Sequence, residues 1–445
     1  MKILATIAAL CLVGGTAATQ QRERVFPFEY QTVRLDNGFT AYLIKAGAPG
    51  QIAYYSIVRT GSRDEVEEGK SGFAHFFEHM MFRGTEKYPN YDAITSAMGA
   101  DRNGFTSSDM TVYYLVTASE YLEQLIDLEA DRFQNLRYSE PDFRTEAGAV
   151  LGEKMQSIMS PFNYLYERLS ELAFDKHTYR HTTIGFERDV RAMPEGYEYS
   201  KSFYRRFYRP ENVVLVLVGD FDHAEAERLL RAHYGSWQPG YVTPDIPVEP
   251  PQQGERRETI TYPGRTLPTL TLNYKAPAWS ATDRSAVALE VLGDLAFGST
   301  SPLYQQLVID ERIVQGLGGF FELQRDPALA TVYAAVLEEA NVPRVEQLIA
   351  ETIAAAKTQL PDAQRLADTK RARRYGFLMG LETAGSVASA TISFVVNTGG
   401  IEAIDDYYTT LEALTPEDIR DAARRYLMNE AKTVMTMMQA TGGDQ

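Results

Sequence analysis

The stretch that decides this chain reads Gly72-Phe-Ala-His75-Phe-Phe-Glu78-His79-Met-Met-Phe-Arg-Gly84. His75 and His79 stand four residues apart, so on a helix both imidazoles lie on one face, and Glu78 lies on that face with them. The surrounding phenylalanines and methionines predict that this helix is buried. It could be a core helix with two hydrogen-bonded histidines. Polar groups buried without partners are costly, however, and this favours a shared metal ion.

Two imidazoles beside a free carboxylate suit a catalytic zinc ion with a reactive water, and the order His-x-x-Glu-His is the inverted form of a known zinc motif. Such a site needs a third protein ligand. Ser139 and Asp142 predict the start of a second helix, on which Glu146 and Glu153 are two turns apart and share a face. One could bind the metal while the other orients a histidine, but their spacing does not say which, and two solvated surface glutamates are the alternative.

Further segments accompany these residues, and each carries its own short motif. They are Leu35-Asp-Asn-Gly38, Gly99-Ala-Asp-Arg-Asn103-Gly-Phe-Thr106 with Thr111-Val-Tyr113-Tyr114, His177-Thr-Tyr-Arg-His181-Thr-Thr-Ile-Gly185, and Tyr208-Arg-Pro210-Glu-Asn212 with the apolar run that follows. Together with the histidine motif and the glutamate pair, they resemble the pitrilysin family of zinc peptidases, which includes insulin-degrading enzyme and the mitochondrial processing peptidase. The resemblance is dense from residue 28 to 222 and more diffuse beyond.

The resemblance implies a role for each site residue. His75, His79 and Glu153 would be the zinc ligands, Glu78 the general base, and Glu146 a carboxylate that orients a ligand. It also implies an α+β fold of two similar α/β-sandwich domains, of the LuxS and processing-peptidase metallohydrolase type, in which two chains close as a clamshell around a peptide.

Substrate binding is predicted at Asn103, Gly104, Phe105 and Thr106, because this segment resembles the strand along which the family binds peptides. An extended peptide can add to such an edge through backbone hydrogen bonds. An ordinary edge strand is the alternative, and Gly104 stands where the family usually has alanine.

In its C-terminal part the chain departs further from the family pattern. Val308 and Gln315 stand at positions where catalytic members carry Arg and Tyr, which contact the peptide and the oxyanion. This predicts a homologous second chain that supplies them, or a homodimer with weakened catalysis.

Composition narrows the class of protein. A hydrophobic fraction of 44% and a charged fraction of 23% are those of a globular protein, and the net charge of −16 argues against a nucleic-acid partner. Lys2, the apolar run 3–13 and the small residues after it predict a cleavable export signal over residues 1–18, and hence a periplasmic or secreted protein. That run is too short to span a membrane. Cys11, the only cysteine, lies within it, so the mature chain would have neither a disulfide nor thiol chemistry.

The chain is long enough for two domains. Five prolines between residues 239 and 251 predict a stiff linker over 239–254, after a zinc-binding domain at 25–238 and before a homologous inactive domain at 255–440. All six histidines precede this linker, so the second half cannot repeat the metal site. His177 and His181 also stand four apart, but their β-branched neighbours make a shared helical face doubtful.

These observations predict a zinc-dependent endopeptidase that hydrolyses peptides or unfolded segments bound as an extended strand in a closed chamber. A non-catalytic structural or peptide-binding subunit of a heterodimer is the alternative. The intact zinc motif argues against this alternative, and the missing Arg and Tyr argue for it.

Overall fold

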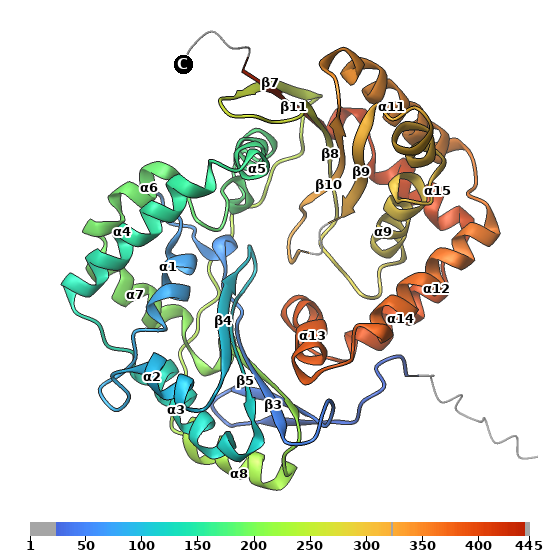
Figure 1. Cartoon of the computed structure of the whole chain (residues 1–445). Helices are drawn as coiled ribbons and strands as arrows, with labels where there is room; N and C mark the ends of the chain where they lie inside the picture. The colour runs from blue at the N-terminus through green and yellow to red at the C-terminus, as the bar shows by residue number, and fades with distance from the viewer. Residues whose placement is uncertain (1–23, 322–323, 441–445) are drawn as a thin grey trace, which may run out of the picture.

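The computed structural model describes residues 24–321 and 324–440. The predicted export signal at residues 1–18, with Cys11, lies outside the described residues. The described chain forms two β-sheets, each with its own helices (Figure 1). This is the α+β architecture that the sequence predicted.

The first sheet has six strands in the order β1-β2-β6-β3-β5-β4, and β2 with β6 is its only parallel pair. Its strands are β1 (Tyr30–Arg34), β2 (Thr40–Ile44), β3 (Gln51–Val58), β4 (Asp101–Thr106), β5 (Thr111–Ala118) and β6 (Val213–Gly219). The run of valines and leucines in β6 is buried along its whole length, as expected for a strand at the centre of a sheet. By contrast, β4 lies at the edge of the sheet, and β5 is its only partner among the described strands.

Among the described residues of the N-terminal half there are eight α-helices. They are α1 (Phe73–Met80), α2 (Tyr91–Ala97), α3 (Leu122–Asn135), α4 (Glu140–Ser157), α5 (Pro161–Ala173), α6 (Glu187–Ala192), α7 (Tyr197–Phe207) and α8 (His223–Tyr234). Phe76 and Phe77 of α1, Phe133 of α3 and Leu229 of α8 share one core against a face of this sheet. The metal-motif helix is therefore held by its apolar side.

The second sheet has five strands in the order β7-β11-β8-β10-β9, again with one parallel pair, β7 with β11. Its strands are β7 (Arg256–Tyr262), β8 (Thr269–Lys275), β9 (Val314–Phe321), β10 (Leu329–Val336) and β11 (Lys432–Gln439). Its helices are α9 (Arg284–Phe297), α10 (Pro302–Tyr304), α11 (Val342–Thr358), α12 (Ala363–Met379), α13 (Ala384–Thr398), α14 (Ala403–Glu412) and α15 (Pro416–Tyr426). A short π-helical turn spans Gln305–Asp310.

The two halves exchange a helix. Leu165 and Leu169 of α5 pack against Ile260 of β7 and Met435 of β11, whereas Val387 of α13 packs in the core that covers the other face of the first sheet. Figure 1 shows α5 beside β7 and β11, and α13 beside β3 and β5. The halves are joined by apolar packing as well as by the chain.

The proline-containing segment between Tyr234 and Arg256 has no helix or strand. Val242 and Val248 in it are largely exposed, but the Glu249 carboxylate accepts hydrogen bonds of 2.9–3.1 Å from the backbone N–H groups of residues 175–177. The connection is therefore fixed to the loop that follows α5. Of the described helices, none is by itself long and apolar enough to cross a membrane. Only α13 and α14 together, bent by 87° at the break between them, match the length and composition of a span.

Candidate metal centre

Helix α1 begins at a position that only glycine fits well. Gly72 has φ +94°, and a Cβ there would come 2.6 Å from the backbone oxygen of Ile184. Because glycine has no side chain to cap the helix, the buried Glu65 carboxylate accepts hydrogen bonds from the N–H groups of Gly72, at 2.7 Å, and Ala74, at 2.6 Å. These bonds fix the direction in which the first turn carries His75.

Helix α4 supplies the carboxylates. It begins at Ser139, which forms a reciprocal capping box with Asp142, as the sequence predicted. The helix packs against α1, so the face that carries Glu146 and Glu153 meets the face that carries the histidines.

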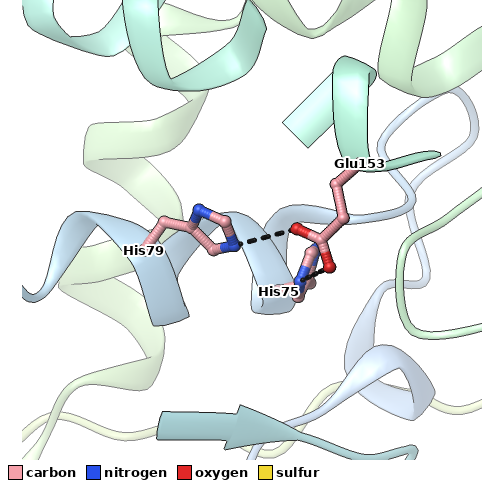
Figure 2. Close-up of side chains that lie close together, drawn as sticks. All are labelled: His75, His79 and Glu153. Carbon is pink, nitrogen blue, oxygen red and sulfur yellow. Dashed lines mark ion pairs between the residues drawn. The ribbon is translucent and has the colours of Figure 1, made fainter. Parts of the chain in front are cut away.

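Glu153 lies between the two histidines (Figure 2). One of its oxygens is 3.5 Å from His75 Nε2 and the other is 3.3 Å from His79 Nε2. Taken one per residue, ligand atoms of these three side chains all lie within 4.8 Å of one another. His75 is almost buried, whereas about half of the Glu153 side chain is exposed, so the group is open to solvent on the glutamate side.

Glu146 has a different position. It accepts a 2.9 Å hydrogen bond from His79 Nδ1, the ring nitrogen that faces away from Glu153, and its other oxygen pairs with Arg83. The two carboxylates that sequence spacing left equivalent are thus separated by geometry. One meets the Nε2 atoms of both histidines, and the other contacts the outer nitrogen of His79. His75 Nδ1 is buried and has no hydrogen-bond partner among the described residues.

The electrostatics of the group suit a cation. The hydrogen bonds with Glu146 and then Glu153 raise the pKa of His79 to about 9. In turn, the His79 bond lowers the pKa of Glu146, and the His75 and His79 bonds lower the pKa of Glu153. These shifts show that negative charge is concentrated around His79. A divalent ion in contact with the Nε2 atoms and Glu153 would balance it, and two imidazoles with a carboxylate are a donor set that zinc accepts.

Glu78 and β4 adjoin this group. The Glu78 carboxylate accepts a 2.6 Å hydrogen bond from Thr106 Oγ1, and a Cβ at Gly104 would lie 3.1 Å from Glu78 Cγ. Side chains alternate along a strand. Gly104 and Thr106 therefore face α1, and the side chain of Phe105 points to the other face, where it is 38% exposed.

Two hollows lie beside the cluster of His75, His79 and Glu153 (the metal group). One of about 490 Å³ is lined by Glu78, His79 and Asn103 among others. The second, of about 750 Å³, is lined by residues from both halves of the chain: His75, Ser107, Ser108, Asp109, Met110, Glu153, Ser157, Phe162, Asn163, Tyr166, Glu167, His181, Thr182, Thr183, Ile184, Gln324, Ser393, Val396 and Asn397. The contribution of α13, through Ser393 and its neighbours, was missed by sequence reasoning, and no motif in the C-terminal half signals it.

The second histidine pair does not form a metal group with acidic or cysteine side chains of the described residues. His177 Nε2 is 3.1 Å from the Asp326 carboxylate, whereas His181 Nδ1 donates to the backbone oxygen of Thr182. Burial lowers the pKa of His181 to about 4, so it is neutral at pH 7. It lines the larger hollow but contacts different partners from His177.

Val308 and Gln315, the positions that depart from the family pattern, do not line these two hollows. Val308 is part of the π-helical turn and packs against the core, and Gln315 on β9 lines a separate hollow with Phe162. Arg312 has φ +54° and donates to the backbone oxygen of Ile309. None of the three is among the described residues that line the two hollows beside the metal group.

Comparison with known families gives two matches. Residues 49–186 match the model described as Insulinase (Peptidase family M16), and residues 196–373 match the Peptidase M16 inactive domain. The zinc protease PqqE of Helicobacter pylori is 28% identical over 424 residues, which are 92% of each chain.

Two solved structures match the fold of this chain. A protease from Helicobacter pylori matches with a TM-score of 0.85 and 25% identity, and the match covers 92% of this chain and 99% of that one. The periplasmic protease PqqL of Escherichia coli matches with a TM-score of 0.75 and 20% identity. That match covers 93% of this chain but only 48% of PqqL, so the whole fold described above corresponds to about half of the longer protein.

Proposed function

The chain belongs to peptidase family M16, and from that premise we propose that it is a zinc-dependent endopeptidase that cleaves peptides or unfolded segments bound as an extended strand. One observation carries the proposal: His75, His79 and Glu153 converge on one another, and the neighbouring Glu78 is hydrogen-bonded to the edge strand β4.

His75, His79 and Glu153 would hold the zinc ion, with Glu146 fixing the ring of His79. A zinc ion bound there would supply Lewis-acid chemistry: it would lower the pKa of a water so that the water can lose a proton and attack a peptide carbonyl at neutral pH. Glu78 would accept the proton of that water and pass it to the nitrogen of the leaving amine. The backbone of Asn103, Gly104, Phe105 and Thr106 would pair with the substrate, which explains how many sequences could be accepted by one site.

A second function has one observation in its favour. Val308 and Gln315 lack the chemistry that the family pattern places there, and neither lines the hollows beside the metal group. A peptide-binding or structural subunit would need neither residue. We rank this behind catalysis, because a structural subunit has no need for the His79–Glu146 contact or for a carboxylate such as Glu78 that lines a hollow together with His79.

We also propose that the working form contains two homologous units, either two copies of this chain or this chain with a partner that supplies Arg and Tyr. The length of PqqL, about twice that of this chain, supports pairing. Each unit would consist of a zinc-binding domain at 25–238 and an inactive domain at 255–440, and cleavage of an export signal near Ala18 would place the protein in the periplasm or outside the cell. N-terminal sequencing of the native protein should then begin near Thr19, and a start at Met1 would contradict export.

The function is tested with the purified chain and an unstructured peptide that carries a quenched fluorophore. We expect about one zinc per chain and cleavage that a chelator abolishes and added zinc restores. Zinc binding together with peptide binding but without cleavage, even with a homologous partner present, would favour the non-catalytic subunit. Absence of zinc would contradict both the metal centre and the proposed chemistry.

A further inference from the structure

The hydroxyl of Thr106 lies 2.6 Å from Oε2 of Glu78, although the two residues are 28 positions apart in the sequence and belong to different elements. An ionised carboxylate can only accept, so the hydroxyl is the donor. Thr106 is the last residue of β4, and the bond is partly buried. It joins the helix of the metal group directly to the edge strand.

A second contact confines the same side chain. A Cβ at Gly104 would lie 3.1 Å from Glu78 Cγ and 3.4 Å from a ring carbon of Phe82. The methylene part of Glu78 therefore lies over the backbone of β4, where a larger side chain would crowd it. One end of Glu78 is fixed by α1, its middle rests on Gly104, and its carboxylate is bound by Thr106.

We propose that Thr106 is a positioning residue for the general base. This inference rests on the proposed function of Glu78. The bond engages Oε2 and selects one orientation of the carboxylate, which leaves Oε1 to accept the proton. Without it, Glu78 would sample several rotamers, and a base displaced by about 1 Å loses much of its rate advantage.

This role differs from the one that sequence resemblance gave Thr106, which was to bind substrate. The backbone of Thr106 still belongs to the edge that a peptide would join, but its side chain points at the base. A substrate paired with β4 would therefore rest on the strand that orients Glu78. Loss of the hydroxyl should then lower kcat and leave KM almost unchanged.

The first test compares Thr106→Val, which keeps the branched shape and removes the donor, with Thr106→Ser, which keeps a donor. We expect kcat to fall about tenfold in the valine variant, with KM and zinc content unchanged, and to return to within about twofold of wild type in the serine variant. Thr259→Val, at an exposed position on the edge strand β7, is the matched control and should have no effect on kcat.

The second test separates positioning from a general structural role. In a Glu78→Gln background, Thr106→Val should cause no further loss, because the base through which it acts is gone. An equal loss in both backgrounds, or a valine variant within twofold of wild type, would overturn the proposal.

A third measurement does not depend on activity. Crystal structures of the metal-free wild-type and Thr106→Val proteins should show one position of the Glu78 carboxylate in the first and more than one in the second. An identical single position in both would refute positioning. If wild-type protein loaded with zinc cleaves no peptide, the proposed function fails, while this crystallographic comparison still decides the role of Thr106.

Discussion

The two halves of the molecule have the same strand connectivity, but among the described residues only the first half brings together histidine and glutamate side chains that could hold a metal. Without β1, the first sheet runs β2-β6-β3-β5-β4 and the second runs β7-β11-β8-β10-β9, with the parallel pair in the same place. Helix α1 follows β3 and contacts the edge strand β4, and α9 follows β8 and contacts the edge strand β9. The halves therefore offer the same helix-on-edge-strand contact twice.

The residues at this contact between helix and edge strand differ between the two halves. A Cβ at Gly319 of β9 would lie 3.1 Å from Gly293 Cα of α9, and a Cβ at Gly293 would lie 2.1 Å from the ring of Phe321. The backbone of α9 thus lies directly against the backbone of β9, and the ring of Phe321 packs against Gly293. In the N-terminal half, by contrast, Gly104 makes room for Glu78. Glu290 of α9 is buried, and its carboxylate accepts hydrogen bonds from Arg373 and Tyr407.

This difference shows that the topology does not require the polar site. One half uses the contact for tight packing, and the other uses it to hold a carboxylate beside two histidines and an open hollow. The C-terminal half then serves the site indirectly, through the wall that α13 contributes to the larger hollow.

The largest effect on the cleavage rate should come from adding a homologous partner chain. Because Val308 and Gln315 supply no charged or phenolic donor, the isolated chain should bind zinc but cleave poorly. A homologous chain with Arg and Tyr at those positions should raise cleavage roughly a hundred- to a thousandfold, the usual value of an oxyanion donor. The rate should saturate at one partner per zinc chain, with zinc content unchanged. An isolated chain that is as fast as any mixture would show that pairing is unnecessary, and Arg312→Ala would then test whether this arginine, near Val308 and Gln315, supplies the donor.

Replacing Glu78 of α1 or Glu290 of α9 by glutamine exchanges a carboxylate for an amide. The first change should affect turnover and the second should affect stability. Glu78→Gln should keep zinc and lower turnover by at least about a hundredfold, since the base is lost. Glu290→Gln should leave turnover per folded molecule unchanged and lower stability by about 1–3 kcal/mol, because a buried charged hydrogen-bond network is weakened. Steady-state kinetics and urea unfolding measure the two effects. Near-normal turnover of the Glu78 variant would remove its assigned role.

The two glutamates of α4 should differ in their effect on zinc. Glu153→Gln should lose most of the metal. Glu146→Gln should retain it with an affinity lower by about tenfold to a hundredfold, as expected for a group that only orients a ligand. Competition with a zinc indicator gives both affinities. Equal affinities in the Glu153 variant and wild type would reject the ligand assignment.

The smallest effect concerns packing in the half without metal. Gly293→Ala should destabilise the protein by about 1–3 kcal/mol, because the new methyl group would displace the ring of Phe321. Gly376→Ala on the exposed side of α12 meets nothing within 4 Å and should stabilise it by about 0.5–1 kcal/mol. Neither should change zinc content. A neutral Gly293 variant in thermal or urea unfolding would show that the contact is looser than described.

Local signals in the sequence predicted much of this molecule. The i, i+4 spacing located the metal-motif helix, the Ser139–Asp142 cap located the helix with both glutamates, and the apolar run of β6 indicated a central strand. Family resemblance ordered the roles of Glu146 and Glu153, which spacing could not do.

The features that sequence reasoning missed depend on contacts between distant segments. The amphipathic sequence of α5 shows that it needs a partner but not that the partner is the second sheet. The glycines of β9 weaken any strand signal. The Thr106–Glu78 bond has no sequence signature, because it exists only where β4 and α1 pack together.

The most direct test of the account is the location of zinc in a crystal of the metal-loaded protein, measured by anomalous scattering at the zinc edge. We predict one strong peak per chain, within bonding distance of His75 Nε2, His79 Nε2 and a Glu153 oxygen. A peak at His177 or His181 instead, or no peak among His75, His79 and Glu153 in protein that contains stoichiometric zinc, would contradict it.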